Sequence, residues 1–200
     1  MRNTGDRIGV KNETFVYHAT RNTEQSRTSV PTAMPRERIP IASDHAGFEL
    51  KEKLRGALEA LGFEADDLGT HDAGSTDYPD YAHPLAREVS DGRSRRGVLL
   101  CGTGLGMSYV ANRYPHVRAA VAWTPEVAEL ARRHNDANVL VLPARFVSED
   151  EAVRILKAWV ETPFEGGRHE RRVEKIEPAP PTGTPPESAP ERAGAPEAMP

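Results

Sequence analysis

The stretch GVLLCGTGLGMS, residues 97–108, decides the fold of this chain. Its apolar part, residues 98–100, is predicted to be a buried strand, because it is a short apolar run bounded by turn residues. Three glycines then alternate with other residues and favour a tight turn, since glycine adopts backbone conformations that other residues avoid. A helix can begin directly afterwards, at Leu105. Cys101, the only cysteine in the chain, lies where the strand meets the turn.

This turn can carry chemistry. Backbone N–H groups at the start of a helix attract anions, and the same field favours the thiolate form of a cysteine placed there. The segment therefore offers a base or nucleophile beside an oxyanion cradle. The alternative is that Cys101 is a small buried apolar residue in a turn that does no chemistry. The glycine spacing matches neither the dinucleotide-binding fingerprint nor the phosphate-binding P-loop, so nucleotide binding is not favoured.

Composition divides the 200 residues into three parts. Residues 1–36 are polar and show no sustained hydrophobic period, which predicts a disordered extension. Residues 178–200 hold eight of the seventeen prolines and cannot bury enough apolar surface to offset the entropy of ordering. Residues 37–177 remain as a single predicted domain, which is long enough to form a core.

Charge and cysteine content exclude several classes of protein. The net charge of −4 has no basic excess, so nucleic acid is not an expected partner. A single cysteine permits no internal disulfide and no multi-cysteine zinc site, and it fits a reducing cytoplasm. No apolar run approaches the roughly 18 residues that span a membrane. The first 20 residues also lack the apolar core of a signal peptide. We therefore expect a cytoplasmic protein with no membrane partner.

Strand and helix signals alternate through the predicted domain. Strands are predicted at residues 39–43, 63–68, 97–101, 117–122 and 139–142. Helices are predicted at residues 50–61, 77–89, 105–112, 126–133 and 149–161, with a last basic helix at residues 168–176. This order predicts an α/β fold with a five-stranded parallel sheet covered on both faces.

Three details of this prediction depend on single residues. Pro40 is expected only at the start of a strand or at a sheet edge. The strand at residues 117–122 is expected to be buried on both faces because of its composition. In the helix at residues 126–133, Val127, Leu130 and Ala131 are expected to point inward.

Ligands bind such sheets beyond the carboxyl ends of the strands. Asp44 and His45 follow the first strand, Cys101 ends the third, and Arg145 follows the fifth. We expect these side chains to lie together. His134 precedes the fifth strand and so lies at the opposite end of the sheet from Cys101 within one chain.

Each of these residues also has a plainer interpretation. Asp44 could simply cap a helix, and His134 could be a satisfied core or interface histidine. Arg168 and Arg172 lie on one helical face, which suits bidentate recognition of a phosphate, but they could form a solvated basic face instead. The histidines include no His-x-x-x-His pair, so no metal site is expected.

Five motifs occur together in this order. They are SDHAGFELK at residues 43–51, DYP at 77–79, CGTGLG at 101–106, HNDAN at 134–138 and GGRHERRV at 166–173. Together they resemble the type B ribose-5-phosphate isomerases, within a wider family that includes galactose-6-phosphate isomerase subunits. The resemblance spans residues 38–177.

The resemblance implies a Rossmann-like three-layer fold, a homodimer or homotetramer, and an active site shared between two subunits. It also implies roles for individual residues. Cys101 would be the base, while Thr103, His134 and Asp44 would serve opening of the sugar ring. The implied binding residues are Gly102, Gly104, Leu105 and Gly106 for the enediolate, Asn135 and Tyr78 for the sugar, and His45, Arg145, Arg168 and Arg172 for the phosphate.

The expected activity is therefore interconversion of D-ribose 5-phosphate and D-ribulose 5-phosphate, a step of the pentose phosphate pathway, without metal or organic cofactor. Two alternatives stay open: an isomerase of another phosphorylated sugar, and a non-catalytic module that binds sugar phosphates. The chain departs from the family pattern at Pro143, where many members have glycine. Some members use a glutamate base later in the glycine loop, but Met107 and Ser108 supply no carboxylate here, so the cysteine form is favoured.

Overall fold

The computed structural model describes residues 35–177. The predicted tail at residues 178–200 and all of the predicted extension except Pro35 and Arg36 lie outside this range. Within the described residues, no helix is both long enough and apolar enough to cross a membrane.

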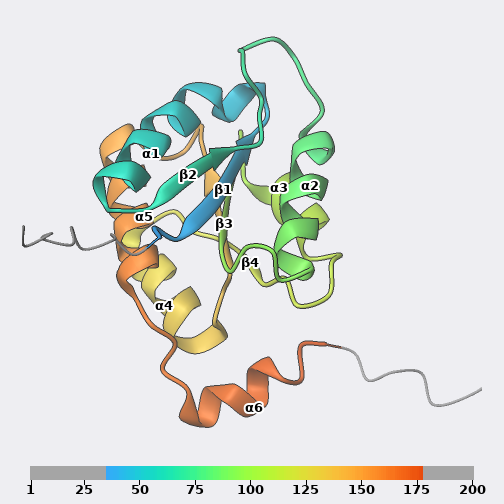
Figure 1. Ribbon diagram of the computed structural model, residues 1–200, viewed down its shortest axis with the longest axis vertical. Helices are drawn as coiled ribbons and strands as arrows, with labels where there is room; N and C mark the ends of the chain where they lie inside the picture. Colours follow the sequence, from blue (N-terminus) through green and yellow to red (C-terminus); the bar gives the residue numbers. More distant parts are fainter. Residues whose placement is uncertain (1–34, 178–200) are drawn as a thin grey trace, which may run out of the picture. The chain divides into compact units, whose positions relative to one another are not determined.

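A five-stranded parallel sheet forms the centre of the fold (Figure 1). Its strands are β1 (Arg38–Ser43), β2 (Glu64–Asp67), β3 (Gly97–Cys101), β4 (Ala119–Val121) and β5 (Val139–Pro143). They are ordered β2-β1-β3-β5-β4, and every neighbouring pair is parallel. From β1 the chain runs to one side to form β2 and returns to the other side to form β3. The carboxyl ends of β1 and β3 therefore flank a topological switch point, the usual place for a ligand in such sheets.

Helices cover both faces of the sheet, which confirms the predicted three-layer α/β fold. The helical elements are α1 (Phe48–Ala60), α2 (Tyr78–Ser90), α3 (Leu105–Ala111), α4 (Pro125–Asn135), α5 (Glu149–Glu161) and α6 (Glu170–Val173), with short 3-10 turns η1 (His45–Gly47) and η2 (Gly167–His169). One core forms between the sheet and α1, α4 and α5, and a second forms between the sheet and α2 and α3. Helix α6 lies apart from the sheet, beyond the end of α4 (Figure 1).

The alternation of side chains along β3 decides which core each residue enters. Val98 and Leu100 pack into the first core, whereas Leu99 and Cys101 pack into the second. Successive side chains of a strand point to opposite faces, so this pattern follows directly from the sequence. It places Cys101 on the side of the sheet that carries α2 and α3.

The structure corrects two of the predicted details. Strand β4 is shorter than predicted and only half buried, because it lies at the sheet edge and pairs with β5 alone. Leu130 does not point inward but is 45% exposed. Helix α4 instead packs through Ala128 and Ala131, whose small side chains are buried.

Two further elements differ in detail from the prediction. Pro40 lies within an inner strand rather than at an edge, but pairing of β1 with β3 begins only at the next residue, Ile41. The missing N–H of proline therefore falls where that ladder has not yet started. The predicted basic helix at residues 168–176 is also shorter than predicted, since only η2 and the four residues of α6 are helical.

Candidate active site

A pocket of about 190 Å³ opens at the carboxyl edge of the sheet, between the ends of β1 and β3. It is lined by Asp44, His45, Ala46, Tyr78, Cys101, Gly102, Thr103, Gly106 and Arg145. The structure therefore brings together the residues that the sequence places after the first, third and fifth strands. It adds Tyr78, which begins α2.

Cys101 lies at the base of this pocket and is 4% exposed. The backbone N–H of Gly104 donates a hydrogen bond to its Sγ atom across 3.2 Å. Gly104 has φ +75°, a backbone angle that favours glycine, and a Cβ at this position would lie close to the side chain of Val121, at 3.1 Å from its Cγ1 atom. The turn thus directs an amide donor at the only thiol in the chain.

Asp44 and His45 are fixed by the turn that follows β1. Asp44 Oδ1 accepts hydrogen bonds from the N–H groups of Ala46 and Gly47, at 2.9 and 3.2 Å. Asp44 therefore caps η1 as the plainer interpretation requires, and it lines the pocket as well. The backbone of Thr76 holds the ring of His45, because its N–H lies 3.2 Å and its carbonyl oxygen 3.3 Å from His45 Nδ1. One of these two groups bonds to Nδ1 in either tautomer of the neutral imidazole.

Arg145 and Tyr78 each lie against a glycine of the loop. A Cβ on Gly102 would lie 3.2 Å from Arg145 Nε, and a Cβ on Gly106 would lie 2.8 Å from the ring of Tyr78. The N–H of Arg145 also donates to the carbonyl oxygen of Gly102 at 3.1 Å. The absence of a Cβ at both glycines thus lets a cationic and an aromatic side chain approach the loop and line the same pocket as the thiol.

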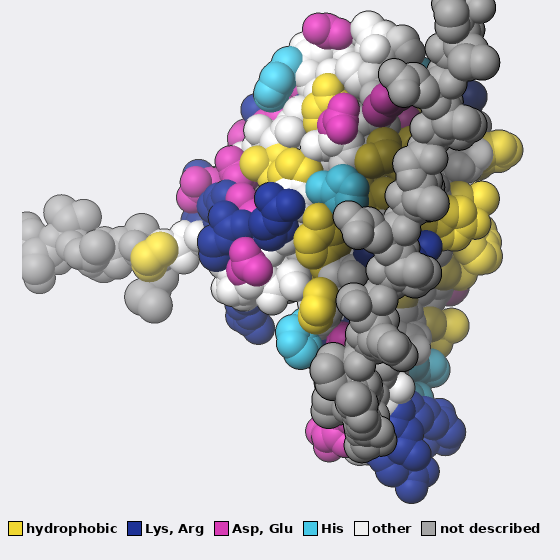
Figure 2. Space-filling model, turned by 90° about the vertical axis from the view of Figure 1, so that its right-hand side faces the viewer, with side chains coloured by type: hydrophobic (Ala, Val, Ile, Leu, Met, Phe, Trp, Pro, Cys, Tyr) yellow, Lys and Arg dark blue, Asp and Glu magenta, His cyan; other side chains and the backbone are white. Residues whose placement is uncertain are grey.

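The outer side of the loop meets an exposed apolar recess of about 370 Å³. Thr103 and Leu105 line it together with Val121, Trp123, Pro143 and Phe146. The N–H of Leu105 donates to Thr103 Oγ1 at 3.3 Å, which fixes the hydroxyl between the pocket and the recess. Leu105, Trp123 and Phe146 are 48%, 57% and 73% exposed. Figure 2 shows hydrophobic side chains gathered along one edge of the molecule.

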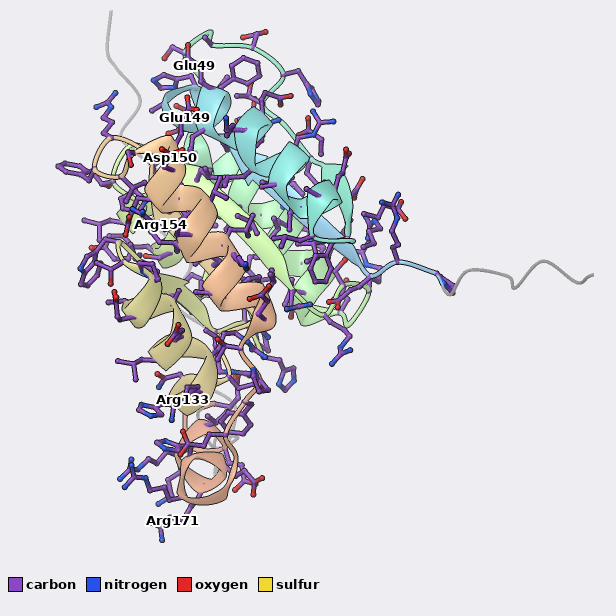
Figure 3. All side chains as sticks on the ribbon, turned by 90° about the vertical axis from the view of Figure 1, so that its left-hand side faces the viewer. Glu49, Arg133, Glu149, Asp150, Arg154 and Arg171 are labelled. Atoms are coloured by element: carbon purple, nitrogen blue, oxygen red, sulfur yellow. The ribbon has the colours of Figure 1, made fainter. Side chains whose placement is uncertain are left out.

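A second group of the predicted site residues lies elsewhere. His134 and Asn135 end α4, and Arg168 and Arg172 lie on η2 and α6. None of the four lines the pocket of Cys101. Figure 3 shows the separation: Glu49, which follows η1, lies at one end of the molecule, while Arg133 and Arg171 lie at the other. Basic side chains also gather at the α6 end in Figure 2. The structure thus groups Arg168 and Arg172 with His134. The sequence alone did not show where these two arginines lie.

Two residues that the sequence analysis did not single out complete this second group. The rings of His134 and His169 are stacked, with centroids 4.3 Å apart and planes inclined by 5°. Glu165 Oε2 lies 3.8 Å from His134 Nε2 and accepts a hydrogen bond from Arg133 at 3.0 Å. Burial lowers the pKa of His169, and the neighbouring His134 and Arg168 lower it further. In the sequence, His169 could have been identified from its position between Arg168 and Arg172 in the motif at residues 166–173.

This group also bears on metal binding. One ligand atom each from His134, Glu165 and His169 lies within 4.8 Å of the others. However, Arg133 donates to Glu165, and Arg168 Nε donates to His169 Nε2 at 3.3 Å. These guanidinium groups occupy two of the three potential ligands and repel a cation, so the arrangement favours an anion nearby.

The chain is similar to known sugar-phosphate isomerases. The family described as Ribose/Galactose Isomerase matches residues 39–176. The chain is 43% identical over 140 residues to ribose-5-phosphate isomerase B of Escherichia coli, which covers 70% of this chain and 94% of that protein. It is 41% identical, with the same coverage, to a putative sugar phosphate isomerase of Bacillus subtilis.

Solved structures show the same relationship. The ribose 5-phosphate isomerase of Thermotoga maritima is 51% identical and covers 70% of this chain and 97% of that one, with a TM-score of 0.68. The Mycoplasma genitalium enzyme with bound ribulose-5-phosphate is 40% identical, covers 72% and 95% of the two chains, and also has a TM-score of 0.68. The chain therefore belongs to the ribose/galactose isomerase family, which makes it a sugar-phosphate isomerase.

Proposed function

We propose that this protein interconverts D-ribose 5-phosphate and D-ribulose 5-phosphate, a step of the pentose phosphate pathway, with Cys101 as the base. The observation that carries the proposal is the thiol in the pocket at the carboxyl edge of the sheet, with an amide donor on its sulfur and Arg145 lining the same pocket. Relatives named ribose-5-phosphate isomerase B support the choice of a five-carbon sugar.

The chemistry accounts for the kinds of residue in the pocket. The Cys101 thiolate takes the proton from C2 of the open aldose, and the carbonyl electron pair moves to O1, which yields an enediolate. A proton then passes from O2 to O1, the thiol returns its proton to C1, and O2 becomes the new carbonyl oxygen. Negative charge that develops on oxygen needs donors held in place, a role that suits the backbone of Gly102, Gly104, Leu105 and Gly106. No redox cofactor takes part, because the electrons stay within the sugar.

We also propose that each active site is completed by a second copy of the chain, in a homodimer or a homotetramer. His134 and the arginines lie at one end of the molecule and Cys101 at the other, so one chain cannot bring them together. The recess formed by Leu105, Trp123 and Phe146 is an exposed apolar surface next to the pocket. Such surfaces typically become buried in oligomers, and burial of this recess would bring the partner next to the pocket.

The remaining roles follow from that arrangement. His134 of the partner subunit, with Thr103 and Asp44, would move protons during opening of the furanose ring, and Asn135 would bind sugar hydroxyls. Arg168 and Arg172 would hold the phosphate dianion, because arginine forks match phosphate oxygens. His45 and Arg145 would assist them, and Tyr78 would line the sugar. A reducing cytoplasm, which we propose as the compartment, would keep the Cys101 thiol free.

A second candidate activity is isomerisation of another sugar phosphate. The family description includes galactose, and some relatives are named only as sugar phosphate isomerases. The pocket is open, and it shares Thr103 with the apolar recess. In the proposed oligomer the partner subunit would close the pocket and so determine the length of sugar that fits.

The test is the rate of ketose formation by the purified full chain, in buffer with a metal chelator, from D-ribose 5-phosphate and from the six-carbon D-allose and D-galactose 6-phosphates. We expect kcat/KM to be highest for the five-carbon sugar and unchanged by the chelator. Higher kcat/KM for a six-carbon sugar would favour the second candidate. Binding of all three sugars without turnover would instead identify a non-catalytic module.

The predicted domain boundaries can be tested in the same assay. A chain of residues 37–177 contains every residue named in the proposed site. We expect it to retain the full kcat/KM of the 200-residue chain, and a large loss would show that one of the terminal segments contributes to the site.

A further inference from the structure

His169 is the one buried residue of the segment at residues 164–177. Only 4% of it is exposed to solvent, while the flanking Arg168 and Glu170 are exposed. Helix α6 buries none of its side chains. A histidine is an unusual choice for the one buried position of a segment, because burial penalises its charged form.

The neighbours of His169 come from three elements and show why its ring is needed. Its ring lies parallel to that of His134, on α4, at 4.3 Å. Arg168 Nε donates to its Nε2 atom at 3.3 Å, so Nε2 accepts and the imidazole proton is on Nδ1. The charged groups around it are Arg133 on α4, Glu165 before η2, Arg168 on η2 and Arg172 on α6. Burial and the positive neighbours lower the pKa of His169, which keeps it neutral near pH 7.

The stack controls the direction of His134. The His134 side chain is 35% exposed and lies in the last turn of α4, and its ring makes no hydrogen bond shorter than 3.5 Å to any residue between 35 and 177. One face of the ring is covered by His169, and its Nε2 atom lies 3.8 Å from Glu165. The carbonyl oxygen of Arg133 accepts a hydrogen bond from the N–H of Glu165 at 3.0 Å, which ties the segment to the end of α4.

We propose that His169 is a positioning residue, whose stacked ring orients His134 for proton transfer during opening of the sugar ring. The inference rests on the proposed function, because His134 acquires its role there. A proton-transfer group loses much of its effect when it is displaced by about 1 Å, so the restraint on its ring matters for the rate. His169 itself touches no reacting atom. Because Arg168 donates to the same ring, His169 also links His134 to the arginine that would hold the phosphate.

The test compares three variants of the full chain: His169→Ala, which removes the ring; His169→Phe, which keeps a ring to stack but removes the acceptor of Arg168; and Val173→Ala, which shortens a half-buried side chain of the same segment. With His169→Ala we expect kcat for D-ribose 5-phosphate to fall by about 10- to 100-fold. His169→Phe should restore kcat to within about threefold of the wild type, because a ring again stacks on His134. Its KM should be raised, as in His169→Ala, because Arg168 has lost the hydrogen bond to His169 Nε2. Val173→Ala should leave kcat within about threefold.

A second readout does not depend on the reaction. The stacked ring of His169 shields the Cε1 proton of His134, so its NMR resonance should move downfield in His169→Ala and less in His169→Phe. Wild-type kcat in His169→Ala, or an unmoved His134 resonance, would overturn the inference. A loss of kcat in His169→Phe as large as that in His169→Ala would overturn it too. If the wild type proves inactive but the His134 resonance still moves in His169→Ala, the proposed reaction is overturned and the stacking contact is not.

Discussion

Cys101 and His134 lie at opposite edges of one sheet. Cys101 is the last residue of β3, whereas His134 lies in the final turn of α4, which leads back to the amino end of β5. In a parallel sheet every strand runs the same way, so the helix that precedes a strand ends at the edge opposite to that strand's carboxyl end. The two residues can therefore act on one substrate only if they come from different chains.

This separation predicts complementation between inactive subunits. Cys101→Ala and His134→Ala chains should each be inactive, but a mixed dimer contains one site in which both residues are intact. With random exchange of equal amounts, half of the dimers are mixed and half of their sites are intact, so about a quarter of wild-type activity should return. Activity is measured after exchange has been verified by mass spectrometry of the mixed species. Absence of recovery despite exchange would contradict the shared site.

Removal of the thiol tests the proposed base. Cys101→Ala should lower kcat by roughly 10²-fold or more, since a positioned base contributes about 10²- to 10⁴-fold. The binding of inorganic phosphate should change little, because Cys101 is not among the cationic groups that would hold it. Met107→Leu offers a matched control, since Met107 is buried in the same core and its side chain does not line the pocket. An active Cys101→Ala enzyme would show that another group is the base.

The contact between Gly106 and Tyr78 can be tested by adding one methyl group. A Cβ at position 106 would lie 2.8 Å from carbon atoms of the Tyr78 ring, so Gly106→Ala forces the ring away. We expect a loss of about 1–3 kcal/mol in the free energy of unfolding, together with a raised KM for the sugar phosphate. Combined with Tyr78→Ala, the same substitution should cost much less stability, because the clash is gone. Equal costs in the two backgrounds, measured by urea unfolding, would rule out this contact as their source.

The carboxylate of Asp67, at the end of β2, bonds both to Lys51 on α1 and to Gly69 in the loop that follows β2. Its pKa lets us predict how the stability of the fold depends on pH. The carboxylate accepts hydrogen bonds from the fully buried Lys51 at 2.7 Å and from the N–H of Gly69 at 3.0 Å. Burial alone would raise the pKa of Asp67, but these donors and Arg55 outweigh it and hold the pKa below its ordinary 3.8. The unfolded chain therefore takes up this proton first. The stabilisation is complete above about pH 4 and is lost as the pH falls through the folded-state pKa.

Asp67→Asn should remove this part of the acid sensitivity. It should also cost about 1–3 kcal/mol in the free energy of unfolding at pH 7, because the buried ammonium group of Lys51 loses one of its two carboxylate partners and keeps Glu52. Urea unfolding from pH 7 to pH 2 measures both effects. Glu49→Gln, an exposed change on α1, the helix that carries Lys51, is the control and should follow the wild-type curve. An identical pH slope for Asp67→Asn and the wild type would contradict the role of this carboxylate.

Much of the fold could be predicted from local pattern. The helix predicted at residues 149–161 has those bounds in the structure, because Ser148 caps it and its apolar residues recur at helical spacing. The alternation along β3 likewise places Cys101 correctly. Leu130 was misplaced because periodicity shows which residues share a face but not which face meets the sheet. The burial of β4 was overestimated because sequence does not reveal which strand is at the edge.

For the site, the sequence determined the chemistry and the tertiary structure decided the grouping. Residues that follow parallel strands must meet at the carboxyl edge, so Asp44, His45, Cys101 and Arg145 could be placed together from the order of the elements alone. Tyr78 over Gly106, and His169 against His134, depend on how helices and loops pack after the sheet has formed. Such contacts join residues far apart in the chain, and no local period encodes them. Their positions therefore emerge only when the whole domain is folded.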